Sequence, residues 1–240
     1  NNLLSGQALA ATGPILPGTW AYNNNLIPVA YDPDRAADLL NEGGWALPPE
    51  AVPGTPDYVR SKNGKTLRFN LIVPADELHQ GLAQVLVANW AALGVQAVVE
   101  SLPVNEIKTA LNSRSFEAAM IDLNFSTTPD PDPYPFWHQT QIENGQNYSG
   151  YNNRNISEIL EQARIIPSYY DRAKFYRAFQ AKFTDQTPAI LLYYPVFTYA
   201  VDKKVSGVQL GPLVDPSDRF NSLPNWHMLT RRVIENASQP

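Results

Sequence analysis

The sequence predicts an α/β fold in which a mixed β-sheet is flanked by helices. Three observations predict it. A strand pattern, a helical pattern and a second strand pattern follow one another over 66–102, a mostly apolar strand is expected at 117–123, and two amphipathic helices follow between 156 and 183. Such alternation of the two periods is typical of βαβ units.

The composition indicates a folded protein and excludes several functions. The chain has 240 residues, 44% of them hydrophobic, which is enough for a substantial core. Its net charge of -5, with only 18 Lys and Arg, argues against nucleic-acid binding. The absence of cysteine excludes disulfides, thiol catalysis and Cys-ligated zinc. The sequence does not begin with Met, and we expect that an upstream part has been removed.

The first predicted elements are a helix and a long loop. Asp32 can cap a helix that has Pro33 at its first position, and Gly43 and Gly44 end it. Four prolines between 45 and 64 argue against both helix and central strand there. This stretch is therefore expected to be a surface loop.

A β-α-β unit is predicted next. In 66–73, Leu67, Phe69 and Leu71 alternate with polar residues, which predicts a strand with one buried face. Apolar residues then recur at helical spacing up to 93, Gly94 ends the helix, and a strand follows at 95–102.

The rest of the body alternates in the same way. Pro103 opens a short helix before the buried strand at 117–123, and two helices with one apolar face each cover 156–166 and 169–183. Strands are expected at 189–194 and 197–201. The tail from 202 to 240 has too little apolar surface for a core of its own, so it should pack on another part of the protein.

The order of these segments resembles the C-terminal half of family 5 extracellular solute-binding proteins, the peptide-, dipeptide- and nickel-binding class of ABC importers. Each motif alone is weak, but their order and spacing together are specific. The matching segments are Gly13-Pro14-Ile15-Leu16-Pro17, Trp20-Ala21-Tyr22-Asn23, Tyr31-Asp32-Pro33, Leu93-Gly94-Val95, Asp130-Pro131-Asp132 and Asn147-Tyr148-Ser149-Gly150-Tyr151.

The resemblance implies a periplasmic-binding-protein-like type II lobe whose N-terminal partner lobe is absent from this chain. It implies three parts: a segment from the first lobe at 1–20, the ligand-binding lobe at 21–201, and a tail at 202–240 that packs on the first lobe. The implied partners are a small-molecule ligand, an oligopeptide or a sugar, and an ABC permease in the membrane. The implied protein is a monomer without cofactor, located outside the cytoplasm as a periplasmic protein or a cell-surface lipoprotein.

The candidate ligand-facing segment lies between 121 and 137, where a buried strand runs into a proline-rich loop. Loops at the carboxyl ends of strands are where α/β proteins place ligands. Asp130 and Asp132 are expected mainly to fix turns through local bonds to backbone amides. The candidate ligand-binding residues of the segment are Asn124, Phe125, Ser126, Thr127, Thr128 and Trp137.

Two positions of this segment bear on the ligand. In family members that bind peptides, an aspartate three residues before Asp-Pro-Asp pairs with the ligand's α-amino group, and a tryptophan lies three residues earlier. Here these positions are Thr127 and Asn124. A hydroxyl cannot supply the charge-assisted bond that a buried ammonium group needs, so a neutral polar ligand such as a sugar or a capped peptide is the hypothesis.

Aromatic residues elsewhere give further candidates. Trp20 and Tyr22 lie on a proline-bounded loop, where aromatic rings either stack on a ligand or cover the edge of the core. Both alternatives stay open, and both residues are retained as ligand-binding candidates. Tyr193, Tyr194 and Tyr199 are expected to be core residues.

The sequence contains no pattern that indicates catalysis or a metal site. His79, His138 and His227 are far apart and lack helical i, i+4 partners, so no metal ligands are expected. A nucleophile elbow and a glycine-rich phosphate loop are both absent. The protein is therefore not expected to be an enzyme. The two alternatives are a carbohydrate-active hydrolase, whose site also needs carboxylates and aromatic rings, and a protein-interaction module.

Overall fold

The computed structural model describes residues 4–124, 130–211, 213 and 216–228. The chain divides into two compact units. Unit 1 contains Ile27–Asn124 and Tyr134–Ser157, and unit 2 contains Leu4–Leu26, Phe125–Pro133 and Glu158–Pro240. The predicted parts at 1–20, 21–201 and 202–240 remain a prediction.

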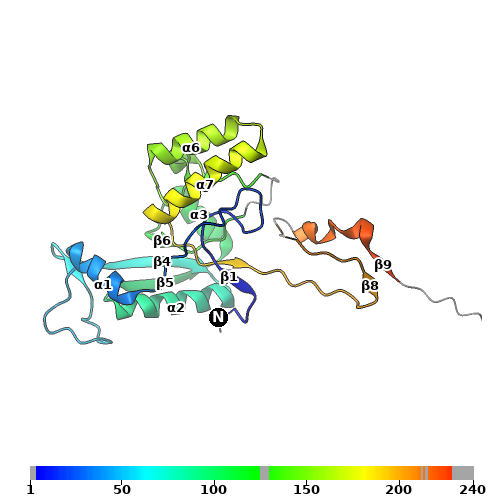
Figure 1. The fold of residues 1–240 in the computed structure, drawn as a ribbon. Helices are drawn as coiled ribbons and strands as arrows, with labels where there is room; N and C mark the ends of the chain where they lie inside the picture. The colour runs from blue at the N-terminus through cyan, green and yellow to red at the C-terminus, as the bar shows by residue number, and fades with distance from the viewer. Residues whose placement is uncertain (1–3, 125–129, 212, 214–215, 229–240) are drawn as a thin grey trace, which may run out of the picture. The chain divides into compact units, whose positions relative to one another are not determined.

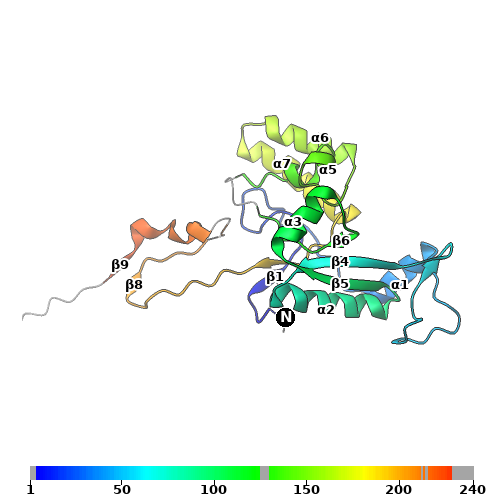
Figure 2. The same cartoon turned by 180° about the vertical axis from the view of Figure 1, so that it is seen from behind.

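Unit 1 is built on a three-stranded parallel sheet with the order β5-β4-β6. β4 is Arg68–Pro74, β5 is Gln96–Leu102 and β6 is Ala118–Ala119. The crossover helices α2, Glu77–Ala92, and α3, Val104–Ser113, lie on opposite sides of the sheet (Figures 1 and 2). The predicted β-α-β unit and the helix after it are thereby confirmed.

The prediction that the first strand has one buried face was wrong. Leu71, Ile72 and Val73 are all at most 5% exposed. Ile72 packs against Ile107 and Leu111 of α3, so the second face is buried too. Because a parallel strand between two helices is covered on both faces, its central part is a continuous apolar run rather than an alternating one.

The predicted strand at 117–123 is shorter in the structure. Only Ala118 and Ala119 pair with β4, opposite Leu71 and Ile72. One further bond, from the N–H of Met120 to the carbonyl of Ile72, continues the contact at 2.9 Å. Apolar sequence predicted the burial of this segment but not the length of its hydrogen-bonded ladder.

The remaining elements of unit 1 are short and are positioned by caps and turns. Asp32 caps α1, as predicted, by accepting from the N–H of Arg35 at 2.8 Å. The proline-rich loop ends in a two-residue hairpin. The elements are α1 at Pro33–Glu42, β2 at Ser61–Lys62, β3 at Lys65–Thr66, α4 at Tyr134–Trp137, α5 at Gln141–Asn144 and α6 at Arg154–Ile165, which ends in unit 2.

Arg60 joins the ends of α1 and α2 within unit 1. It is 3% exposed. Its Nε donates to the carbonyl of Leu93 at 2.6 Å, and one terminal nitrogen donates to Asn41 Oδ1 at 2.6 Å and to the carbonyl of Trp45 at 2.7 Å. Gly94 lies beside it with φ of +76°, and a Cβ there would be 3.1 Å from Arg60 Cγ. Glycine is thus required at this helix end both by its backbone conformation and by the close approach.

Asp76, the N-cap of α2, makes the stability of unit 1 depend on pH. The backbone N–H of His79 donates to the carboxylate of Asp76 at 3.0 Å, and this bond is the largest cause of the lowered pKa of Asp76. A lowered folded-state pKa gives a stabilisation that is complete above the unfolded-state value of about 3.9 and is lost as the pH falls through the folded-state value. We expect Asp76→Ala to cost about 1 kcal/mol at neutral pH.

Urea unfolding of unit 1 at a series of pH values measures this effect. The decrease in the free energy of unfolding caused by Asp76→Ala should become smaller as the pH falls below about 4. Asp76→Asn is the matched control, because it keeps a capping oxygen and should lose less at neutral pH. A cost that stays constant down to a pH of about 2 would contradict the prediction.

Unit 2 contains a short antiparallel pair and a helical hairpin. β1, Ala8–Ala10, pairs with β7, Tyr193–Pro195. The C-terminal part of α6 packs beside α7, Tyr169–Gln186 (Figures 1 and 2). One buried cluster joins Ala163 of α6 and Tyr176 of α7 to Ile15 and Ala21 of the N-terminal segment. The predicted helices at 156–166 and 169–183 are confirmed.

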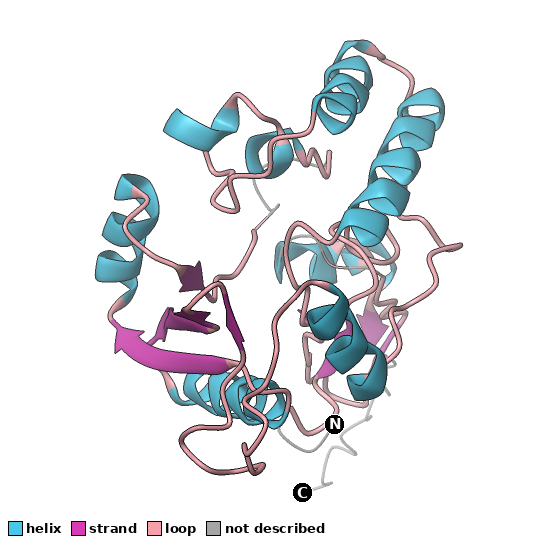
Figure 3. Ribbon diagram, turned by 90° about the vertical axis from the view of Figure 1, so that its left-hand side faces the viewer, coloured by secondary structure: helices cyan, strands magenta, loops and turns pink. Residues whose placement is uncertain are grey.

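Two strand predictions in unit 2 are corrected. The strand expected at 189–194 is found only at Tyr193–Pro195, and 197–201 forms no ladder. Phe197 is 47% exposed. Because residues after Pro195 have no adjacent strand in the described part of the chain, their β-propensity does not produce pairing. Figure 3 draws the strands in magenta; the longest of those described, β4 and β5, have 7 residues each and belong to unit 1.

The tail forms a small motif of its own within unit 2. β8, Val205–Ser206, pairs with β9, His227–Met228, and two 3-10 helices, η1 at Pro216–Phe220 and η2 at Leu223–Asn225, lie between them in sequence. Three aromatic rings, those of Tyr199, Phe220 and Trp226, gather with centroids 6.0 to 6.2 Å apart. Among the described helices of the chain, none has the length and apolar character of a membrane span.

Candidate functional site

The structure describes four of the eight predicted ligand-binding residues. Phe125, Ser126, Thr127 and Thr128 lie outside the described residues. Asn124 is exposed at the end of the segment that follows β6 in unit 1. Trp137 also belongs to unit 1, in α4, and at 4% exposure its ring presents little surface to a ligand. Trp20 and Tyr22 belong to unit 2, where they lie on the same loop.

Trp20 covers the edge of the core of unit 2. Its ring centroid is 5.0 Å from that of Tyr169 and 5.6 Å from that of Tyr176, both in tilted arrangements. The side chain is half-buried against the core. Of the two alternatives, covering the core is thus observed, while the exposed part of the ring is still accessible to a ligand.

The segment that carries Trp20 and Tyr22 is held by buried polar side chains. Ala21, between them, is fully buried, and its carbonyl accepts from Gln180 Nε2 at 2.9 Å. Gln180 Oε1 accepts from the N–H of Asn23 at 3.1 Å. The Tyr22 hydroxyl lies 2.7 Å from Thr12 Oγ1. These bonds fix the backbone on which both aromatic rings are displayed.

Tyr194 holds the start of the same segment. Its hydroxyl donates to the carbonyl of Gly13 at 2.5 Å and accepts from the N–H of Gly13 at 2.9 Å. Burial raises the pKa of Tyr194, and it raises that of Tyr176 as well. Both phenols are therefore protonated donors at neutral pH. Of the three tyrosines predicted to be core residues, Tyr194 is buried at 8% exposure, whereas Tyr193 and Tyr199 are only partly buried.

Asp130 and Asp132 make longer-range contacts than the predicted local bonds to backbone amides. Asp130 pairs with Arg172 and accepts from the Tyr176 hydroxyl at 3.0 Å. Asp132 accepts from Arg164 Nε at 2.8 Å and Nη2 at 2.6 Å. The expected local bonds alone therefore do not describe them, because both carboxylates bind arginines of the α6–α7 hairpin.

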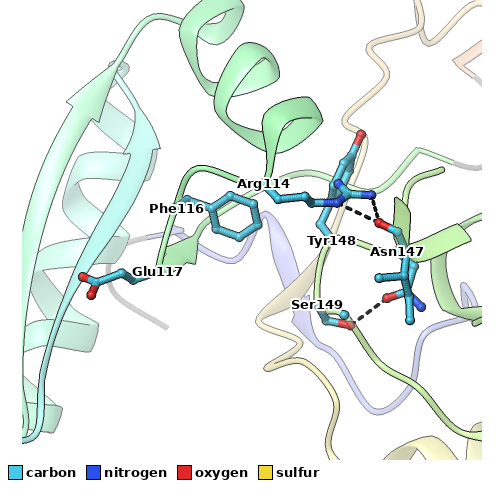
Figure 4. Close-up of a pocket in the computed structure, with 8 residues that line it drawn as sticks. Arg114, Phe116, Glu117, Asn147, Tyr148 and Ser149 are labelled. Carbon is cyan, nitrogen blue, oxygen red and sulfur yellow. Dashed lines mark hydrogen bonds between the residues drawn. The ribbon is translucent and has the colours of Figure 1, made fainter. Parts of the chain in front are cut away.

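A pocket of about 330 Å³ lies in unit 1 beside α3. Arg114 ends α3 with φ of +55°, and its guanidinium donates to the carbonyls of Ile142 and Gly145 at 2.6 and 2.8 Å and lies 4.7 Å from the Tyr148 ring centroid. Figure 4 shows this arrangement, with the labelled lining residues Arg114, Phe116, Glu117, Asn147, Tyr148 and Ser149.

Sequence reasoning missed this pocket. The sequence identifies the loop Asn147-Tyr148-Ser149-Gly150-Tyr151 only as a segment that resembles the family, and nothing in the sequence indicates a role for Arg114. The pocket combines aromatic rings with a carboxylate and a hydroxyl, so it can accommodate a small polar molecule. The arginine is already bonded to backbone carbonyls, so its main role is to hold the loop.

The histidines of the described part have protein partners. His79 Nδ1 lies 2.7 Å from Asp76 Oδ2, and His138, which is 1% exposed, lies 2.8 Å from Thr140 Oγ1 and stacks on Tyr134. In the residues that the structure describes, no group of three or more His, Cys, Asp or Glu side chains could hold a metal ion.

Known proteins resemble the chain in both sequence and fold. It is 23% identical over 218 residues to the oligopeptide-binding protein AppA of Bacillus subtilis, covering 90% of this chain and 39% of the relative. It is 25% identical over 219 residues to the dipeptide-binding protein of Escherichia coli, covering 87% and 37%. The chain thus spans about two fifths of the length of these curated relatives.

The solved structures share the fold. The oligopeptide-binding protein AppA from Bacillus subtilis, in complex with a nonapeptide, matches with a TM-score of 0.73 at 21% identity, over 95% of this chain and 44% of that one. HbpA2 from Haemophilus parasuis matches with a TM-score of 0.72 at 20% identity, over 94% and 41%. The predicted fold class, an α/β lobe of the periplasmic-binding-protein-like type II class, is confirmed.

The family follows from a match over more than half of the sequence. The model for bacterial extracellular solute-binding proteins, family 5 Middle, covers residues 1–145. The order of motifs that predicted the resemblance lies largely within this range. The chain therefore belongs to the family 5 bacterial extracellular solute-binding proteins.

Proposed function

We propose that this chain is part of the solute-binding component of an ABC importer. In this proposal it binds an oligopeptide or another small polar solute without a chemical step and delivers it to a membrane permease. The match of residues 1–145 to the family model carries the proposal. Relatives named as oligopeptide- and dipeptide-binding proteins support a peptide-sized ligand.

The proposed ligand contacts are residues that the sequence predicts. Asn124, with Phe125, Ser126, Thr127 and Thr128, would contribute from one segment, and Trp20 and Tyr22 from another. Hydroxyl and amide groups with aromatic rings suit a neutral polar ligand, because they form hydrogen bonds and stacking contacts without requiring a charge on the ligand. We place the protein outside the cytoplasm as a monomer, in the periplasm or as a lipoprotein on the cell surface.

Release would follow from a hinge between two lobes. A ligand that contacts both lobes stabilises the closed state by its higher affinity for that state. Weak binding of the open state then allows transfer to the permease. This step of the proposal follows from the family and requires a partner lobe.

Mass spectrometry of small molecules that copurify with the protein tests the proposed function. We expect a peptide or a sugar, and calorimetry with free and N-acetylated tripeptides then separates charged from capped amino termini. Thr127→Asp should favour free amino termini, because it restores a carboxylate that can pair with an ammonium group. The absence of any retained ligand together with turnover of glycosides would contradict the proposal in favour of a hydrolase.

A further inference from the structure

Five side chains of unit 2 form a closed circuit of contacts. Trp20 lies against the rings of Tyr169 and Tyr176. The Arg172 guanidinium carbon is 5.5 Å from the Tyr169 ring centroid, and Arg172 pairs with Asp130. Asp130 in turn accepts from the Tyr176 hydroxyl at 3.0 Å. Asp130 and Trp20 are 110 positions apart in the sequence. The circuit connects them by two routes, one through Tyr176 and one through Arg172 and Tyr169.

The ion pair in this circuit is shielded and doubly fixed. The side chain of Asp130 is 23% exposed and that of Arg172 is 16% exposed. Arg172 Nε and Nη2 also donate to the carbonyl of Ile166 at 2.9 and 2.7 Å, which holds the guanidinium at the end of α6. A charge-assisted bond in such surroundings restricts both partners more strongly than a solvent-exposed pair does.

We propose that Asp130 is a positioning residue for Trp20, acting through Tyr176 and Arg172. Asp130 accepts a hydrogen bond from the hydroxyl of Tyr176, whose ring contacts Trp20. It also pairs with Arg172, whose guanidinium lies near the ring of Tyr169. Replacing the carboxylate by an amide leaves one accepting oxygen for two donors and removes the charge that pairs with Arg172, so the two rings and the indole that packs on them can rotate. The role assigned to Trp20 as a ligand contact rests on the proposed function, whereas its positioning by Asp130 does not.

The neighbouring carboxylate provides a matched control. Asp132 stands on the same Asp-Pro-Asp turn and is also 23% exposed in its side chain, but it pairs with Arg164 on α6. Asp132→Asn therefore removes a similar ion pair from the same turn without removing the acceptor of Tyr176. Any general effect of loosening the turn should appear equally in both variants.

Fluorine NMR of the protein labelled with 5-fluorotryptophan tests the positioning role. The chain has 5 tryptophans, and Trp20→Phe assigns the resonance of Trp20. In Asp130→Asn, this resonance should shift by more than its linewidth, while those of Trp45, Trp90 and Trp137 should not. A general loss of folding would instead change all of them.

Tyr176→Phe keeps the experiment informative if Asp130→Asn does not fold. It retains the ring that contacts Trp20 and removes only the hydroxyl that binds Asp130. A shifted Trp20 resonance in Asp130→Asn or Tyr176→Phe, with none in Asp132→Asn, supports the proposal. An unchanged Trp20 resonance in both, or an equal shift in Asp132→Asn, overturns it.

A second measurement on the same variants tests the ligand role separately. Copurified ligand per mole of protein should fall several-fold in Asp130→Asn and in Trp20→Phe, and should be kept in Asp132→Asn. Retention of ligand by Trp20→Phe would remove Trp20 from the proposed binding function. The NMR result needs no ligand, so failure of the proposed function and failure of the positioning role are distinguishable.

Discussion

Replacing Arg60 by methionine is expected to destabilise unit 1 by about 2–4 kcal/mol. Methionine fills part of the space of the arginine stem but donates no hydrogen bond. The carbonyls of Leu93 and Trp45 and the amide oxygen of Asn41 then lose their donor at a position that is 3% exposed. An unsatisfied buried acceptor costs about 1–3 kcal/mol, and the effects of neighbouring sites are not additive. Asn41 is exposed and its oxygen can bind water instead, so the two carbonyls account for most of the loss.

Native-state hydrogen exchange measures this effect unit by unit. The amides of α2 and β4 should exchange faster in Arg60→Met, because both elements belong to the unit whose opening becomes easier. Arg68→Met is the control, since Arg68 is exposed on β4 and its loss should change the free energy by no more than about 0.5 kcal/mol. Equal exchange rates in the two variants would show that the bonds of Arg60 contribute nothing.

Replacing Gln180 by leucine is expected to destabilise unit 2 by about 2–4 kcal/mol. Gln180 is fully buried and uses both ends of its amide. Nε2 donates to the carbonyls of Ala21 and Tyr176, each at 2.9 Å, and Oε1 accepts from the N–H of Asn23. Leucine leaves the N–H of Asn23 and the carbonyl of Ala21 without these partners inside the protein.

The loss of stability in Gln180→Leu should appear as faster hydrogen exchange of the α7 amides and as a smaller amount of retained ligand. The segment with Trp20 and Tyr22 is bonded to Gln180 at Ala21 and at Asn23, so its release should also weaken the proposed binding. Gln162→Leu on the exposed side of α6 is the matched control and should be nearly neutral, because glutamine and leucine have similar helix propensities. A destabilisation of less than about 0.5 kcal/mol in Gln180→Leu would refute the prediction.

Local rules predicted the elements of this chain well where a short stretch contains the whole signal. Asp32 before Pro33 and Gly94 after an apolar helix were enough to place both helix ends, because capping depends on neighbours within a few residues. Strand lengths were predicted less well. Pairing at 118–119 and at 193–195 depends on which strand lies alongside, and that information is distant in sequence.

The site shows the same division between local and distant information. Trp20 and Tyr22 could be selected from their loop, but the contact of Trp20 with Tyr169 and Tyr176 depends on how α7 folds back onto it. The pocket beside Arg114 had no sequence signal at all. Its walls come from residues about 30 positions apart, which only the fold brings together.

The sequence by itself determined the α/β class, the family resemblance and the candidate segments, because periodicity, caps and the order of motifs are properties of neighbouring residues. The tertiary structure decided the partners of the buried polar groups. Nothing in the sequence distinguishes Arg60, Gln180 and Asp130 from ordinary polar residues. Their roles depend on partners from distant elements, which are backbone carbonyls for Arg60 and Gln180 and an arginine for Asp130. A buried polar group must find a partner, and which partner it finds is decided by the packing of the whole unit.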